Sequence, residues 1–403
     1  MAAHRLEVAD VFREHAGAYV AENGASVEHK RVLRDIVACR TAALGGHVKR
    51  CQKCAHKEFF YKSCANRHCP KCQGAARAKW LEARAADLLQ TRYFHVVFTL
   101  PHKLGPIALQ NKREVYGILF RAAAETLLKI AKDPKHLGAD IGFLAVLHTW
   151  GQRLNLHPHI HCVVSGGGLS GDGRKWVSSR KNFFVHVKVL SRVFRGKFLH
   201  YLRRAFNSGK LTLEGKLKHL RNPASWEAML KSLKKNDWVV YAKRPFGSAT
   251  LVLKYLARYT HRVAISNQRL VSLKHAKVTF SWRDYKSQHH KRTTTLDAHE
   301  FIRRFLLHVL PTGFQRIRQY GFLANRVRKQ QLELARELLG EKNKPDAPSR
   351  EEPDLQNDVG PTGEERYDVC PACKSGHLIP LGEIKPDRQL LETLLDPEGI
   401  DSS

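Results

Sequence analysis

The chain has 403 residues, of which 69 are Lys or Arg and 37 are Asp or Glu, so its formal net charge is +32. Its 43% hydrophobic content can fill real cores, which excludes a disordered polypeptide. The sequence has no uncharged apolar stretch of about 18 residues, and residues 1–20 lack an apolar core. We therefore expect a soluble, cytoplasmic protein whose basic surface binds a polyanion.

The charge is unevenly distributed along the chain. Residues 341–403 contain 7 Lys and Arg against 15 Asp and Glu, a net charge of −8, so the rest of the chain carries +40. Residues 342–368 are rich in Pro, Asp, Glu, Gly and Asn, which is a linker composition. The sequence therefore predicts a basic body followed by an acidic, flexible tail.

Helices and strands are predicted without strict alternation, which indicates the α+β class. Helices are expected over 6–43, from Cys72 to about 91, over 113–132, within the very basic stretch 188–233, and over 251–264, 298–310 and 321–339. Strands are expected over 93–100 and 238–241, in an antiparallel hairpin of 141–150 with 159–165, and in a hairpin of 270–273 with 278–282.

Two cysteine knuckles near the N-terminus predict a metal site. Six of the nine cysteines (Cys39, Cys51, Cys54, Cys64, Cys69 and Cys72) lie in the first quarter of the chain, which favours metal binding in a reducing compartment over disulfides. Fourteen residues separate Cys54 from Cys69, the spacing of a zinc ribbon. Cys51, Cys54, Cys69 and Cys72 are therefore expected to close one structural, tetrahedral zinc site.

Other metal-ligating residues leave alternatives open. Cys64 and His68 lie between the knuckles and are possible additional zinc ligands, although the spacing does not demand it and simple packing is the preferred interpretation. Lysines and arginines alternate with Phe59, Phe60 and Tyr61 here, which suits a nucleic-acid surface, while a purely structural ribbon is the alternative. In the tail, Cys370 and Cys373 form half a site near His377. They could bind zinc across a dimer, borrow a ligand or have no role, and we prefer the last interpretation.

A short histidine-rich strand predicts a second kind of metal site. Alternate side chains of a strand share a face, so His159 and His161 point the same way, about 7 Å apart, while Ile160 faces the core. Two imidazoles so placed can hold one divalent ion, with substrate phosphate oxygens at its open positions. Gln152 is the candidate third ligand and His148 a weaker one. Exposed structural histidines are the alternative, which the buried-strand residues that follow disfavour.

Two tyrosines mark a helix that carries candidate catalytic residues. Tyr255 and Tyr259 are one turn apart, and Arg258 and Arg262 fall on the same arc, opposite the apolar stripe. A tyrosine that attacks a phosphodiester must lose a proton from a group of pKa about 10, which nearby guanidinium groups ease. The alternative is an aromatic pair beside solvated arginines.

The ordered set CANRHCPKCQ, YFHVVFTLPH, NLHPHIHCVVSGG, YLARYTHRVAIS and FIRRFLLHVLPTGFQRIRQYG carries a family resemblance. Over residues of about 10 to 335 the chain resembles the bacterial rolling-circle insertion-sequence transposases, relatives of the Helitrons with an HUH metal motif and two catalytic tyrosines. The resemblance implies that His159 and His161 are metal ligands and that Tyr255 and Tyr259 are nucleophiles. It also implies that the cysteine knuckles belong to the transposase zinc-binding domain.

The implied activity is that of a metal-dependent tyrosine DNA endonuclease and strand transferase. It would nick single-stranded DNA at element ends through 5′-phosphotyrosine intermediates and transfer strands to target DNA, using structural Zn²⁺ and catalytic Mg²⁺ or Mn²⁺. Its place would be the bacterial cytoplasm, at the nucleoid during action. The alternatives are a replication initiator or relaxase with the same chemistry and a non-catalytic zinc-ribbon DNA-binding regulator.

These assignments predict four segments. Residues 1–90 would be a helical zinc-binding DNA-recognition domain, and residues 91–310 the catalytic domain, an HUH-type antiparallel sheet flanked by helices. Residues 311–340 would form a basic helical extension, and residues 341–403 the acidic linker and tail that carry the last cysteine knuckle.

Overall fold

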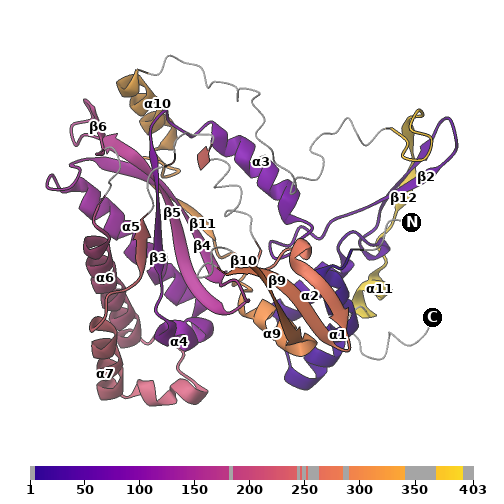
Figure 1. Ribbon diagram of the computed structural model, residues 1–403, viewed down its shortest axis with the longest axis horizontal. Coiled ribbons are helices and arrows are strands. Elements are labelled where there is room, and N and C mark those ends of the chain that lie inside the picture. Colours follow the sequence, from indigo (N-terminus) through magenta and orange to yellow (C-terminus); the bar gives the residue numbers. More distant parts are fainter. Residues whose placement is uncertain are drawn as a thin grey trace.

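The structure is a computed structural model, and it describes residues 5–180, 185–242, 246, 251–252, 263–284, 290–340 and 369–393. It has the predicted α+β character, with antiparallel sheets and flanking helices (Figure 1). Its cysteines are clustered. No helix in the described part of the chain is both long enough and apolar enough to cross a membrane. The predicted helix over 251–264 lies largely outside these residues.

The largest sheet is antiparallel and lies at the centre of the fold. Its strands follow the order β11-β4-β5-β3-β7, and β6 pairs with β5 outside this path. The predicted hairpin is confirmed as the β4–β5 pair. The bounds are β3 (Tyr93–Thr99), β4 (Asp140–Trp150), β5 (Leu156–Leu169), β6 (Trp176–Ser178), β7 (Val240–Ala242) and β11 (Ile317–Gly321). Because β11 pairs with β4, part of the expected helical extension over 311–340 is in fact a strand of this sheet.

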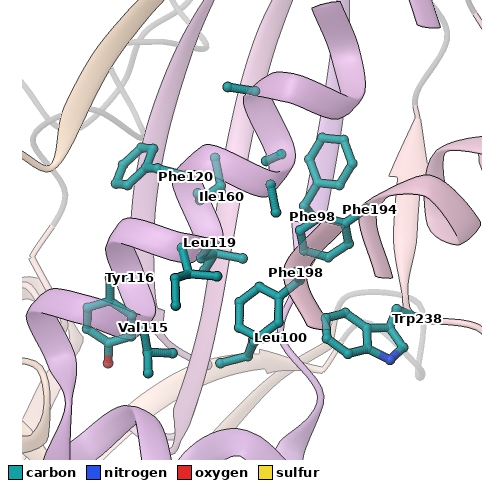
Figure 2. Close-up of a cluster of buried hydrophobic side chains, with 14 of the residues drawn as sticks. Phe98, Leu100, Val115, Tyr116, Leu119, Phe120, Ile160, Phe194, Phe198 and Trp238 are labelled. Carbon is teal, nitrogen blue, oxygen red and sulfur yellow. The ribbon is translucent and has the colours of Figure 1, made fainter. Parts of the chain in front are cut away.

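Helices cover one face of this sheet. Alternate residues of β3 and β5, such as Phe98 and Ile160, point into a core that they share with α5 and α6. In Figure 2, Phe98 and Phe194 meet Phe198 and Trp238 between sheet and helices, and the rings of Phe98 and Phe194 lie 4.9 Å apart. The helices of this layer are α4 (Gly105–Gln110), α5 (Lys112–Lys132), α6 (Val187–Asn207) and α7 (Pro223–Lys234), with short 3-10 helices at His102–Leu104 and Gly215–Arg221.

The N-terminal helices share a core with residues from much later in the chain. The aromatic rings of Phe12 and Phe305 pack edge to face, 5.0 Å apart, and both side chains are fully buried. The core lies between α1 (Val8–Asn23), α2 (Val27–Ala38), α9 (Ala298–Leu307) and a second sheet, β10-β9-β8, of β8 (Leu270–Lys274), β9 (Lys277–Asp284) and β10 (His290–Asp297). A 3-10 turn at Asn267–Arg269 precedes β8. This packing crosses the boundary that the sequence predicted near residue 90.

A third, small sheet joins the two ends of the chain. Its order is β12-β1-β2, and it lies apart from the central sheet (Figure 1). The strands are β1 (Gly46–Cys51), β2 (Lys57–Tyr61) and β12 (Leu378–Ile384), and α11 (Arg388–Thr393) contacts the 3-10 turn Ala42–Leu44. Residues 369–393, expected as an unpaired tail, therefore complete the N-terminal sheet.

Two further helices pack against the central sheet. The helix α3 (Gln73–Ala85) follows the last N-terminal cysteine, as predicted, and runs from the small sheet toward the central one (Figure 1). Its Trp80 and Leu81 pack against the central-sheet face that α5 and α6 leave open. The helix α10 (Arg328–Leu339) packs near β6 and ends at Gly340, whose φ of 72° lies in the left-handed region that favours glycine.

The aromatic core shown in Figure 2 should contribute strongly to the stability of the fold. Phe198 is fully buried, with its ring 5.2 Å from that of Trp238, so Phe198→Ala removes a ring and leaves a cavity. We expect it to lower the free energy of unfolding by about 3–5 kcal/mol in a urea titration. The matched control is Phe59→Ala in β2, where the side chain is 54% exposed and the loss should be small. Equal losses would contradict this packing.

Candidate metal centres

Histidines gather on the central-sheet face opposite α5 and α6. On β5, Ile160 points into the helical core, so the flanking His159 and His161 share the other face, as predicted. On β4, Leu147 points into the same core, which places His148 on the histidine face. The register pairs His148 directly with His159.

The three side chains converge on one point. The ligand nitrogens of His148, His159 and His161 all lie within 4.8 Å of one another. His148 is 2% exposed and His161 is 8% exposed, so the site is largely shielded from water on the sheet side. Three imidazoles at this spacing can hold one divalent ion and leave further positions open for substrate oxygens.

Hydrogen bonds orient two of these rings. His159 Nδ1 donates to the carbonyl of His157 at 2.6 Å, which turns Nε2 toward the shared point. His161 Nδ1 lies 2.8 Å from Nε2 of His95 on β3, and the two rings stack. If Nε2 of His161 binds the ion, its Nδ1 carries the proton and donates to Nε2 of a neutral His95. A hydrogen bond of this kind, from the ring nitrogen that does not bind the metal, fixes the orientation of a ligating imidazole.

His148, the weaker of the two candidates for third ligand, joins His159 and His161, because strand pairing places it opposite His159. Gln152, the preferred candidate, belongs to the turn between β4 and β5, where its backbone carbonyl accepts a hydrogen bond from Arg269. Its role as a ligand stays a prediction from the sequence. His157 lies 5.0 Å from His159, measured between ring centroids, and its burial lowers its pKa, so the ring is neutral at pH 7.

A buried histidine supports the turn that carries Gln152. His308 at the end of α9 donates through Nε2 to the carbonyl of Leu154, and its Nδ1 accepts from Thr149 Oγ1, both at 3.1 Å. Burial lowers the pKa of His308 to about 3, so it stays neutral and keeps this donor and acceptor pattern. The β4–β5 turn is thereby attached to α9.

The candidate nucleophiles Tyr255 and Tyr259, with Arg258 and Arg262, lie outside the residues that the structure describes. Their assignment remains a prediction from the sequence.

The N-terminal cysteines form a four-thiol cluster that contains two of the four predicted members, Cys69 and Cys72. Cys39, Cys64, Cys69 and Cys72 hold their sulfurs within 4.8 Å of one another. Cys72 Sγ lies 3.5 Å from those of both Cys39 and Cys64. Cys39 ends α2 and Cys72 precedes α3, so one ion here would tie the two helices together.

The structure does not bring the two predicted knuckles together. Cys51 and Cys54 lie at the turn of the β1–β2 hairpin, whereas Cys64 to Cys72 follow its base. Five strand residues at about 3.4 Å each separate turn from base by about 17 Å, too far for one ion. Cys51 and Cys54 instead meet Cys370 and Cys373 from the tail, so the structure groups the two predicted knuckles with different partners.

Of the two additional candidates, Cys64 is in the first cluster and His68 is not. His68 Nε2 accepts a hydrogen bond from the backbone amide of Leu310 at 3.4 Å. Burial lowers its pKa well below the ordinary value, so the ring is a neutral acceptor that ties the cysteine segment to the loop after α9.

An arginine-lined cleft of about 750 Å³ lies between the cysteine segment, α3 and β11. Its lining includes Arg67, Trp80, Arg84, Arg316 and Arg318. Burial lowers the pKa of Arg316 to about 10, so its guanidinium still carries a charge at neutral pH. The cleft also reaches Leu144, which shares the histidine face of β4.

Sequence reasoning missed Cys39 and His95 as parts of these sites. Cys39 stands alone, 25 residues before Cys64, and only the packing of α2 brings it close. For His95 a signal was present: it alternates with Phe94 and Val96 on a buried strand, where a polar ring needs a partner.

The geometry defines a protein with a cysteine-rich N-terminal module and a three-histidine centre on an antiparallel sheet, and comparison with known proteins identifies its family. Residues 11–100 match the family described as "Transposase zinc-binding domain". Residues 142–331 match the family described as "Putative transposase".

Two relatives extend the match over most of the chain. "Putative transposase y4qJ" from Sinorhizobium fredii (strain NBRC 101917 / NGR234) is 51% identical over 384 residues, which cover 94% of this chain and 96% of the relative. "Transposase for insertion sequence element IS801" from Pseudomonas savastanoi pv. phaseolicola is 31% identical over 327 residues, or 80% of this chain and 77% of the relative. No solved structure matches.

The chain therefore belongs to the rolling-circle insertion-sequence transposases that carry an N-terminal zinc-binding domain. This makes it an enzyme that acts on DNA, and its cysteine-rich module binds structural zinc.

The contact between His95 and His161 generates the second prediction. His95→Ala should weaken Mn²⁺ binding at the histidine centre by about 10- to 100-fold, because His161 loses the partner that fixes its ring. Isothermal titration of the purified protein measures this affinity. The control is His136→Ala, which changes an exposed histidine in the loop after α5. An unchanged affinity for the His95 variant would show that His161 is oriented by other contacts.

Proposed function

We propose that this transposase nicks single-stranded DNA at the ends of its element through 5′-phosphotyrosine intermediates and then transfers the strand to target DNA. The observation that carries the proposal is the convergence of His148, His159 and His161 on one point of a shielded sheet face. DNA binding alone needs only basic side chains, whereas three converging imidazoles can hold a divalent ion that assists phosphodiester chemistry.

The histidine centre would bind a catalytic divalent ion. A bound ion would polarise the scissile phosphate and neutralise charge that develops on its oxygens. Imidazole ligands favour first-row transition ions over the harder Mg²⁺, so this site is expected to bind Mn²⁺ more tightly than Mg²⁺. His95 and the His157 carbonyl would hold His161 and His159 with Nε2 directed at the ion.

The chemical step would be a displacement at phosphorus. The hydroxyl oxygen of Tyr255 or Tyr259 attacks the phosphate, the P–O3′ bond breaks, and a P–O bond to the tyrosine forms. The phenol loses its proton to solvent and the departing 3′ oxygen gains one, so charge and bond count balance. Arg258 and Arg262 would favour the phenolate. The bond conserves the energy of the phosphodiester for strand transfer.

The arginine-lined cleft offers a path for the strand to reach this centre. Guanidinium groups can pair with phosphates, and Trp80 can stack on a base, which together suit a single strand. Leu144 at the cleft and His148 at the centre are four residues apart on one face of β4, about 13 Å. We expect the enzyme to act at the bacterial nucleoid, where such DNA lies.

The structural zinc is proposed to lie between Cys39, Cys64, Cys69 and Cys72. Four thiolates close a tetrahedron and leave no position open, so this ion would contribute to folding and not to catalysis. His68 would then position the cysteine segment against the loop after α9.

The family assignment disfavours the two alternative functions that the sequence left open. A replication initiator or relaxase would use the same centre at a fixed origin, and the zinc module before the catalytic strands disfavours it. A non-catalytic DNA-binding regulator would form no covalent DNA adduct, which separates it from both enzymes in a single assay.

The metal centre is tested by His159→Ala combined with His161→Ala. Nicking of a labelled single-stranded element end should be abolished, while DNA affinity stays nearly unchanged because the basic surface supplies it. A denaturing gel measures the adduct with Mn²⁺, with Mg²⁺ and with chelator, and a binding titration on the same samples is the control. Nicking at the normal rate in the double variant would remove the metal assignment.

The two tyrosines are tested separately, because they cannot both be in line with one phosphate. Each of Tyr255→Phe and Tyr259→Phe loses only a hydroxyl, so folding should change little. Each single variant should still form some adduct on isolated oligonucleotides yet fail in transposition in cells, and the double variant should form no adduct. If one single variant transposes normally, the protein works with one nucleophile.

A further inference from the structure

A second group of four thiols lies at the small sheet, built from residues more than 300 positions apart. Cys51 Sγ is 3.7 Å from that of Cys373, and Cys54 Sγ is 3.6 Å from that of Cys370. All four sulfurs lie within 4.8 Å of one another. In a tetrahedron with zinc–sulfur bonds of about 2.3 Å, the sulfurs are about 3.8 Å apart. The observed spacing matches that figure and not the much shorter bond of a disulfide.

The two knuckles have the same backbone turn. The residue after each second cysteine, Ala55 and Lys374, is in the left-handed region, with φ of 58° and 56°. In both turns that residue's amide donates to the carbonyl of the first cysteine, at 3.1 Å and 2.9 Å. Non-glycine residues adopt this conformation only where the surroundings demand it. The two turns therefore present their thiols in equivalent ways.

Backbone amides also point at the sulfurs. The amide of Lys53 donates to Cys51 Sγ at 3.4 Å, and that of Gly376 donates to Cys373 Sγ at 3.3 Å. Such contacts stabilise a thiolate, the form of cysteine that binds metal. A side chain at residue 376 would place its Cβ 2.4 Å from Cys51 Sγ, so only glycine permits this approach.

Few apolar contacts hold residues 369–393 against the N-terminal module. The buried apolar contacts at this junction comprise Cys51, Cys370 and Leu378, with Phe60 and Cys373 packed against them. In β12, Leu378 is buried, whereas Pro380, Leu381, Gly382 and Glu383 are exposed. A module with so small a core needs a disulfide or a metal to be stable.

We propose that Cys51, Cys54, Cys370 and Cys373 bind a second structural zinc ion, which fastens residues 369–393 to the N-terminal module. The ion closes a zinc ribbon whose two knuckles come from opposite ends of the chain. Its binding energy holds β12 beside β1 as the third strand of the sheet. The proposal is independent of the nuclease chemistry, since neither knuckle contacts the histidine centre.

Zinc stoichiometry of the full chain tests the proposal. The measurement uses a His159→Ala, His161→Ala background, so that the histidine centre contributes no metal, and protein purified under reducing conditions. Elemental analysis should find two zinc ions per chain in that background and one after Cys370→Ser with Cys373→Ser. The matched control is Ser375→Ala, which removes the hydrogen bond from Lys53 Nζ to Ser375 Oγ but no thiol, and it should keep both ions. Equal zinc content in all three proteins would overturn the site, as would a disulfide among these cysteines found by intact mass.

Retention of the tail provides a second readout that does not depend on zinc counting. A protease recognition site inserted between residues 341 and 368 of the full chain allows the tail to be cut from the body. The cut fragment should co-elute with the body in size-exclusion chromatography, and it should separate in the Cys370→Ser, Cys373→Ser variant. Gly376→Ala should also release it, because the added methyl group collides with Cys51 Sγ. If the cut fragment separates from the body even with all four cysteines intact, zinc does not hold the tail in place and the proposal is wrong.

Discussion

The pairing of β4 with β5 is the interaction on which the candidate catalytic centre depends. It sets His148 opposite His159 and leaves Ile160 and Leu147 for the helical core. Since side chains alternate along a strand, a slip by one residue would turn His159 and His161 into that core and break the centre. Burial of the apolar face therefore fixes the register, and the register fixes which histidines converge. Stability and chemistry are coupled through one hairpin.

Features that depend on local periodicity could be predicted from the sequence. Strand alternation alone placed His159 and His161 on one face, and the periodicity of apolar residues located α1, α2, α5 and α9. Features that depend on long-range pairing could not. The predicted hairpin made His148 only the weaker third ligand, because the exact register that sets it opposite His159 is not written in the local sequence. Nothing near Cys39 says that α2 carries it to Cys72. The spacing of the knuckles gave a wrong grouping for the same reason, because the number of residues between Cys54 and Cys69 does not reveal that an extended strand, β2, separates them.

The division into segments shows a similar limit. Residues 264–309 are distant in sequence from α1 and α2, yet Phe305 packs on Phe12 in one core. Arg67 adds polar contacts across the same junction, donating to the carbonyls of Phe314 and Pro311. The cysteine-rich module is thus attached to the sheet that holds the histidines through several independent contacts. A strand of DNA bound to one would be held in a defined position relative to the other.

The pairing of β12 with β1 makes the order of synthesis matter. Residue 61 ends the hairpin and residue 378 begins its third strand, so a ribosome must add more than 300 residues before the small sheet can be completed. At the usual rate of about 5–20 residues per second, this takes roughly 15–65 s. Until then, one edge of β1 has no partner strand and Cys51 and Cys54 lack the thiols opposite them. A chain broken off before its tail would never acquire this sheet, so the fold distinguishes a finished polypeptide from a fragment.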